Sequence, residues 1–143
     1  MDTEKKQLNL LEEDWARWEP FTELKPAYDI INIQDDMDYL RILIHSTKCD
    51  QQLEVVFDTD SAYRKTDETF RLNLINQLSE KYGDEFYVKW SFFKIENSNY
   101  MKWLSEQSNG YTGDLKLKHF VIMGIDSIVD IVAYEEPKFK LLE

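Results

Sequence analysis

Residues 28–58 read YDIINIQDDMDYLRILIHSTKCDQQLEVVFD, and this stretch decides the fold that the sequence predicts. Apolar and polar residues alternate in three runs, at 28–33, 39–46 and 53–58, with the period of two expected of half-buried strands. The connections at 34–38 and 47–52 are polar and too short for a crossover helix. The three runs therefore predict an antiparallel meander.

Three helices are predicted around this meander. Apolar residues at helical spacing predict the first over residues 6–18, before Pro20. The second follows Thr66 and two acids, carries an apolar residue at every fourth position and ends at Gly83. A third, short helix begins after Asn97-Ser98 and closes at Asn109-Gly110 in a left-handed turn. We expect its Trp103 in the core.

Further strands are predicted at 86–92, 115–123 and 127–134, and the last two are joined by the short link 124–126. The expected fold class is α+β. It consists of a single antiparallel-rich sheet of about six strands with helices packed on a face, in the order α-β-β-β-α-β-α-β-β. No low-complexity linker divides the chain, so residues 1–143 are expected to form one domain.

Composition excludes several function classes. The formal net charge is −11, and a field of that sign repels nucleic-acid phosphates and anionic membranes. Cys49 is the single cysteine, so no intrachain disulfide forms, and the N-terminal residues lack a signal-peptide core. A cytoplasmic location is expected. Between Asp29 and Glu68, ten acids stand against four bases, which predicts one acidic surface made from the loops and strand edges of the meander.

The sequence offers no complete metal or catalytic motif. Residues 58–61 begin like a calcium loop, but Tyr63 stands where a glycine is needed and Thr69 where a bidentate glutamate is needed. His119, with Asp126 or Asp130 and a serine such as Ser91 or Ser127, has the residue types of a hydrolytic site without its sequence signature. We therefore expect no metal, no cofactor and no catalytic residue.

A non-enzymatic, acidic protein-binding module fits these observations best. One form of this hypothesis is an immunity-type protein that masks a basic partner such as a nuclease toxin. The partner-binding residues expected are Tyr39, Asp58, Asp60 and Tyr111, which lie in loops or on the outer strand face. One alternative is a small-molecule-binding or hydrolytic domain with a pocket near His119, and another is a homodimeric structural protein.

Overall fold

The structure is a computed structural model that describes residues 11–58 and 60–142, apart from the side chains of residues 60, 61, 113 and 114. Its described strands form two antiparallel sheets. The four-stranded sheet has the order β2-β3-β4-β9, with β2 at Tyr28–Asp35, β3 at Leu40–Ser46, β4 at Gln51–Phe57 and β9 at Lys138–Leu142. The five-stranded sheet has the order β1-β6-β7-β8-β5, with β1 at Asp14–Arg17, β6 at Phe92–Glu96, β7 at Lys118–Met123, β8 at Ser127–Ala133 and β5 at Asp60–Asp67.

The meander predicted from residues 28–58 is confirmed. Tyr28 pairs with Ser46 and Leu40 pairs with Phe57, so β2, β3 and β4 follow one another as antiparallel neighbours. The predicted hairpin around Gly124 is also confirmed, because Met123 pairs with Ile128 across the turn between β7 and β8.

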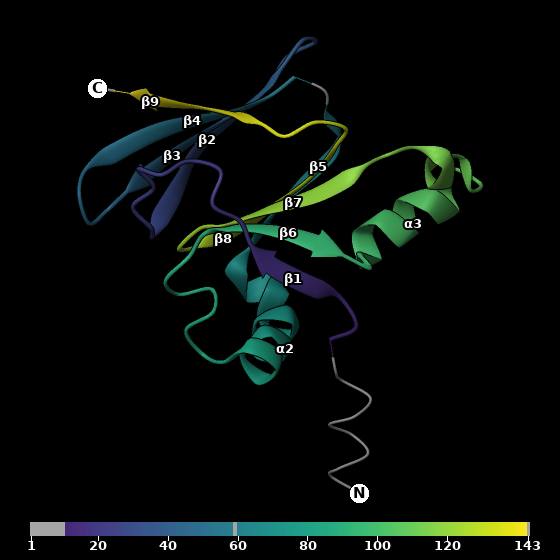
Figure 1. The fold of residues 1–143 in the computed structure, drawn as a ribbon, viewed down its shortest axis with the longest axis horizontal. Coiled ribbons are helices and arrows are strands. Elements are labelled where there is room, and N and C mark those ends of the chain that lie inside the picture. The colour runs from purple at the N-terminus through teal and green to yellow at the C-terminus, as the bar shows by residue number, and fades with distance from the viewer. Residues whose placement is uncertain (1–10, 59, 143) are drawn as a thin grey trace, which may run out of the picture.

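The two sheets pack face to face, and the helices cover the outer face of the five-stranded sheet (Figure 1). Apolar side chains from both sheets meet in the larger core cluster, which includes Ile42, Val55, Phe120 and Ile131. On the other face, Leu78 of α2 (Leu72–Tyr82) packs in a second cluster with side chains of β1, β6, β7 and β8. Every residue of β8 is buried for this reason.

The expected single six-stranded sheet is therefore wrong. The structure is mostly β, with two sheets and, among the described residues, only two short α-helices. One reason is that two strands, β5 and β9, are absent from the prediction. β5 reads DSAYRKTD, and its Arg64 lies opposite the buried Asp130 of β8. β9 is a mostly exposed edge strand on β4.

The helix predicted over residues 6–18 is wrong where it can be checked, and residues 1–10 lie outside the described part. Residues 14–17 form β1, which pairs with β6. Trp15 packs in the helix-side cluster, whereas Trp18 packs against the cluster between the sheets. A separation of three residues puts side chains on opposite faces of a strand but on one face of a helix, which explains the misleading pattern.

The strand predicted at 86–92 is also wrong, because residues 84–88 form a turn and the strand begins at Phe92. The turn carbonyls of Glu85 and Phe86 accept hydrogen bonds from the guanidinium of Arg17 in place of a ladder partner. Phe92 then faces the other sheet while Phe93 faces the helices.

The two remaining helix predictions are confirmed in position. A 3-10 turn, η1 at Glu68–Arg71, leads into α2, which stops at Gly83. Ser98 caps α3 (Asn99–Gln107), and Asn109 and Gly110 adopt positive φ beyond its end. Trp103 is 52% exposed, so its expected place in the core is wrong. Within the described residues, no helix has the length and apolar character needed to cross a membrane.

Candidate functional site

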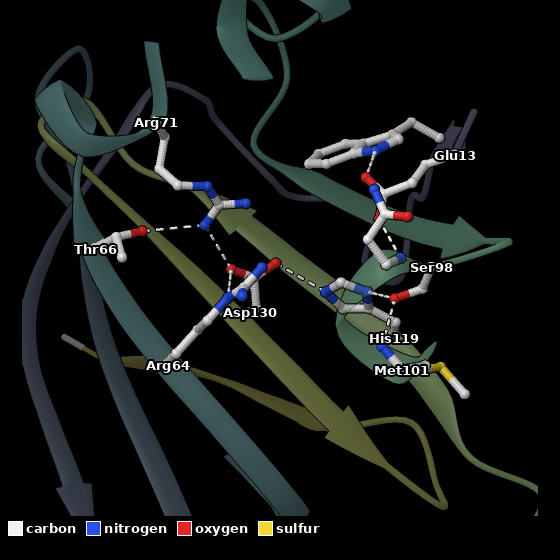
Figure 2. A network of polar contacts seen from close by, with 10 residues as sticks. Glu13, Arg64, Thr66, Arg71, Ser98, Met101, His119 and Asp130 are labelled. Atoms are coloured by element: carbon white, nitrogen blue, oxygen red, sulfur yellow. Dashed lines mark hydrogen bonds and ion pairs between the residues drawn. The ribbon is translucent and has the colours of Figure 1, made fainter. Parts of the chain in front are cut away.

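A buried carboxylate anchors a polar network between the five-stranded sheet and α3 (Figure 2). Asp130 lies at the middle of β8 with no exposed surface. Its Oδ1 is 2.8 Å from Nε2 of His119 on β7. Its Oδ2 accepts hydrogen bonds from Nε of Arg64 at 3.0 Å and from Nη1 of Arg71 at 2.8 Å. Both carboxylate oxygens are thus hydrogen-bonded, as burial of a charge requires.

Asp130 remains ionised in this environment. Burial by itself raises the pKa of its carboxyl, but the hydrogen bond from His119 and the charges of Arg71 and Arg64 outweigh burial and hold the pKa well below its ordinary value. Arg64 also lies over the ring of Tyr100, with its guanidinium carbon 4.2 Å from the ring centroid. The network therefore ties β5, β7, β8, η1 and α3 to one another.

Ser98 completes a line of three residues with His119 and Asp130. The Oγ of Ser98 accepts the backbone N–H of Met101 at 3.0 Å and lies 2.6 Å from Nδ1 of His119. The ionised Asp130 can only accept, so Nε2 of His119 carries the proton of that hydrogen bond. In the neutral ring Nδ1 is then the acceptor, and the Ser98 hydroxyl donates to it. The hydrogen-bond pattern thus fixes one tautomer of the ring.

This line has the residue types of a Ser-His-Asp triad but differs in how the ring is used. In the hydrolase triad the serine contacts Nε2 and the aspartate contacts Nδ1, whereas here the two nitrogens are exchanged. Two arginines already neutralise Asp130, so the carboxylate is less able to stabilise a protonated His119 during catalysis. Ser98 itself is 5% exposed. The geometry favours a structural network.

The sequence pointed to part of this site. His119 is joined to Asp130, whereas Asp126 lies in the turn between β7 and β8. Ser91 and Ser127 are buried without a hydrogen bond to His119, and the serine that reaches the ring is Ser98. Its role as a helix cap was visible in the sequence, but its contact with a residue 21 positions away was not.

A pocket of about 410 Å³ lies beside this network, between the end of β6, α3 and the segment that follows it. Ser98 is one of its lining residues, while His119 and Asp130 are not. Five of its eleven lining residues are apolar, including Met101, Leu104 and Leu115. The pocket therefore gives a ligand access to Ser98 but not to the rest of the network.

The structure places two of the four expected partner-binding residues near each other. Tyr39 and Asp58 lie at the same end of the four-stranded sheet, because Leu40 pairs with Phe57. Asp60 opens β5, and its side chain lies outside the described part of the structure. Tyr111 begins η2 (Tyr111–Asp114), beyond α3, and is 70% exposed. Their role in binding stays a prediction.

The expectation of one acidic surface between Asp29 and Glu68 is wrong. Pairing of Asp29 with His45 and of Asp35 with Leu40 puts these two acids at opposite ends of β2, an eight-residue strand that spans more than roughly 20 Å. Six of the other acids divide between the same two ends, whereas Glu54 lies at the middle of β4. One end carries Asp35, Asp36, Asp38 and Asp58, and the other carries Asp29, Asp50, Asp67 and Glu68.

Cationic side chains offset part of the charge at the Asp35 end. Arg41 forms an ion pair of 3.0 Å with Asp36, and Lys138 forms one of 3.2 Å with Asp58. Backbone N–H groups of Tyr39 and Asp38 lower the pKa of Asp36, which shows that this carboxylate organises its own turn. Fewer carboxylates are free for a partner here.

The opposite end carries acids around an apolar depression, which we call the acidic groove and define by Asp29, Asp67, Glu68, Asp126, Val88 and Ile125. One part is a pocket of about 240 Å³ with Val88 and Ile125 in its lining. The adjoining part, of about 450 Å³, is lined by Asp29, Asp67 and Asp126 with Lys65. The turn between β7 and β8 supplies residues to both.

The acidic groove is held by backbone contacts between its elements. The N–H of Ile125 donates to the carbonyl of Tyr28, and the N–H of Glu68 donates to the carbonyl of Asp126, each at 3.0 Å. Among the described residues, no ion pair joins its four carboxylates to a cation. Hydrogen bonds from Thr69 lower the pKa of Asp67, so this carboxylate stays charged.

No group of three or more metal-ligating side chains is found within the described residues. No family model matches the chain, and neither a curated protein nor a solved structure matches it significantly. The functional argument therefore rests on the geometry above.

Proposed function

We propose that this chain is a non-enzymatic binding protein for a basic protein partner. The observation that supports it best is the acidic groove, where an apolar pocket that includes Glu68 adjoins a depression lined by Asp29, Asp67 and Asp126, and none of these four carboxylates is in an ion pair among the described residues. In the described lining of the groove, Lys65 is the one base against these four acids. The net charge of −11 gives the whole molecule a field of the same sign.

The groove combines the two elements that protein interfaces use. Apolar side chains at the centre supply affinity, because water leaves their surface on binding. Val88 is 54% exposed and Ile125 is 40% exposed, so both keep surface that a partner would bury. Charged groups at the rim mainly raise the association rate and discriminate against acidic partners.

In its sharpest form the proposal is an immunity-type protein that masks a basic partner, such as a nuclease toxin, in the cytoplasm. The single cysteine, exposed and unpaired with another cysteine, is compatible with a reducing compartment. A partner that binds nucleic acid needs a cationic surface, and this is the surface that the acidic groove complements.

Co-isolation from the source cells tests this function. The tagged chain, crosslinked at physiological salt and purified, is expected to bring down one protein with a basic isoelectric point in a 1:1 complex, and to inhibit its activity. A neutral or acidic partner would contradict the proposal, and so would a stable homodimer with no second protein. The matched negative control is a variant in which the four groove acids are changed to their amides (Asp29→Asn, Asp67→Asn, Glu68→Gln and Asp126→Asn) and Asp130 is kept.

A second candidate function follows from Ser98, which joins His119 and Asp130 and also lines the 410 Å³ pocket. It is a hydrolytic or small-molecule-binding function. The exchanged ring nitrogens and the two arginines on Asp130 weigh against hydrolysis. A panel of p-nitrophenyl esters tests it: turnover that is abolished by Ser98→Ala but retained by Ser105→Ala, another residue of the same pocket, would favour this function over the first.

A further inference from the structure

We propose that the acidic groove binds an extended basic segment of the partner that inserts one bulky apolar side chain into the 240 Å³ pocket. This inference rests on the proposed function and specifies its partner. It comes from the pairing of a small apolar pocket with a larger, carboxylate-lined depression beside it.

The volume of the apolar pocket indicates a side chain as its occupant. Sites for drug-sized ligands usually measure about 300–1,000 Å³, and this pocket is smaller. Its lining includes Ile75, Met123 and Ile128, whose buried surfaces give the pocket an apolar floor. Val88 and Ile125 stand at its exposed rim. A leucine or a phenylalanine has the shape and polarity for this space.

The adjoining depression sets the charge of the residues next to that side chain. Asp29 comes from the start of β2, Asp67 from the end of β5 and Asp126 from the β7–β8 turn, so three elements direct carboxylates to one place. Both β2 and β5 are edge strands of their sheets. An extended segment therefore has a path between two sheet edges, with lysine or arginine side chains beside the carboxylates.

The opposite end of the molecule lacks this combination. Asp36 and Asp58 there are already in ion pairs, and no described pocket includes Tyr39. Met37 and Tyr39 are exposed there, and neither lines the acidic groove or the 410 Å³ pocket. Charge complementarity together with an apolar pocket thus assigns the segment to the acidic groove.

The test uses a seven-residue peptide with a central leucine and three lysines on each side, followed by nitrogen-15 NMR of the full chain. We expect amide shifts at Gly124, Ile125 and Val88. Replacing the leucine of the peptide by serine should weaken binding roughly tenfold or more, because a buried leucine contributes about 1.5–3 kcal/mol. The double variant Asp29→Asn/Asp126→Asn should weaken binding of the leucine peptide about threefold or more.

The matched control is Asp35→Asn/Asp38→Asn, which removes the same charge at the other end and should leave the affinity unchanged. Equal binding of the leucine and serine peptides would overturn the inference that an apolar side chain inserts into the pocket. Shifts confined to residues 35–41, or no shift with either peptide, would overturn the groove as the docking site. These outcomes do not test the proposed function, binding of a basic protein partner. That function is contradicted only if co-isolation yields no basic partner.

Discussion

Replacing Asp130 by asparagine should destabilise the fold severely, although it changes only one oxygen to an NH₂ group. The carboxylate accepts hydrogen bonds from Arg64, Arg71 and His119 and has no contact with water. An asparagine offers only one acceptor oxygen. Its NH₂ group is a donor, and it would face either the N–H groups of the arginines or the N–H of His119, which are also donors. At least one cationic or N–H donor is then left without its partner.

The size of the effect follows from the exposure of the partners. The Arg71 side chain is 15% exposed, so its bond to the carboxylate acts in a poorly solvated environment, whereas Arg64 is 43% exposed and screened by water. Removing one partner of a buried ion pair destabilises a protein by about 3–5 kcal/mol, and the screened Arg64 contact adds little. For a chain of this size that corresponds to a fall in Tm of roughly 6–20 °C.

Urea unfolding followed by tryptophan fluorescence measures this change, with Asp126→Asn as the matched control. Asp126 lies in the adjoining turn, exposed and without an ion pair in the described residues, so its amide variant should fall within about 0.5 kcal/mol of the native chain. The pH dependence gives a second readout. Because the folded pKa of Asp130 lies below its unfolded value, its contribution is present above about pH 4 and is lost as the pH falls further.

The stability difference between the native chain and Asp130→Asn should therefore be constant near neutral pH and shrink toward about pH 3. A difference below about 0.5 kcal/mol at pH 7 would refute the reasoning, since that is the range of ordinary surface substitutions. A difference that stays the same from neutral pH to about pH 3 would show that charge is not the cause.

Three further predictions concern single positions. Ser98→Ala removes the α3 cap and leaves Nδ1 of His119 without its donor, so thermal unfolding should show a loss of roughly 2–4 kcal/mol, while Ser98→Thr keeps most of the stability. Gly124→Ala would bring a Cβ within 2.9 Å of the carbonyl oxygen of Ser127, and urea unfolding should show a loss of about 1–3 kcal/mol. Lys94→Ala removes a partly exposed ion pair with Glu136 and should change the unfolding free energy by less than about 1 kcal/mol.

The local sequence pattern was enough to predict elements that follow a single periodicity or a helix-capping rule. The alternation in residues 28–58 gave the meander, and the caps at Ser98 and Gly83 gave the ends of two helices. Trp15 and Trp18 were wrongly assigned to a helix. A spacing of three residues places side chains on one face of a helix but on opposite faces of a strand, and the sequence does not distinguish the two. The predicted single sheet omitted β9, a short and mostly exposed edge strand, and β5, whose residues show no regular alternation.

The candidate sites needed long-range contacts that no local pattern contains. Asp130 was noticeable as a charge within an apolar run, but its partners Arg64 and Arg71 are 66 and 59 residues away. The acidic stretch was visible as composition, whereas its division into two ends depends on the strand register. A count of charges along the chain therefore identified the acidic stretch but could not show which of its acids share a surface of the folded protein.

The association rate of the co-isolated basic partner is the most direct test of the central claim. It should be measured for the native chain, for Asp29→Asn/Asp126→Asn and for Asp35→Asn/Asp38→Asn, at about 10 mM and about 150 mM salt, where the screening length falls from roughly 30 Å to 8 Å. We predict slower association at the higher salt and, at low salt, a larger decrease for the groove variant than for the control. Association that is indifferent to salt, or slowed equally by both variants, would contradict recognition through the acidic groove.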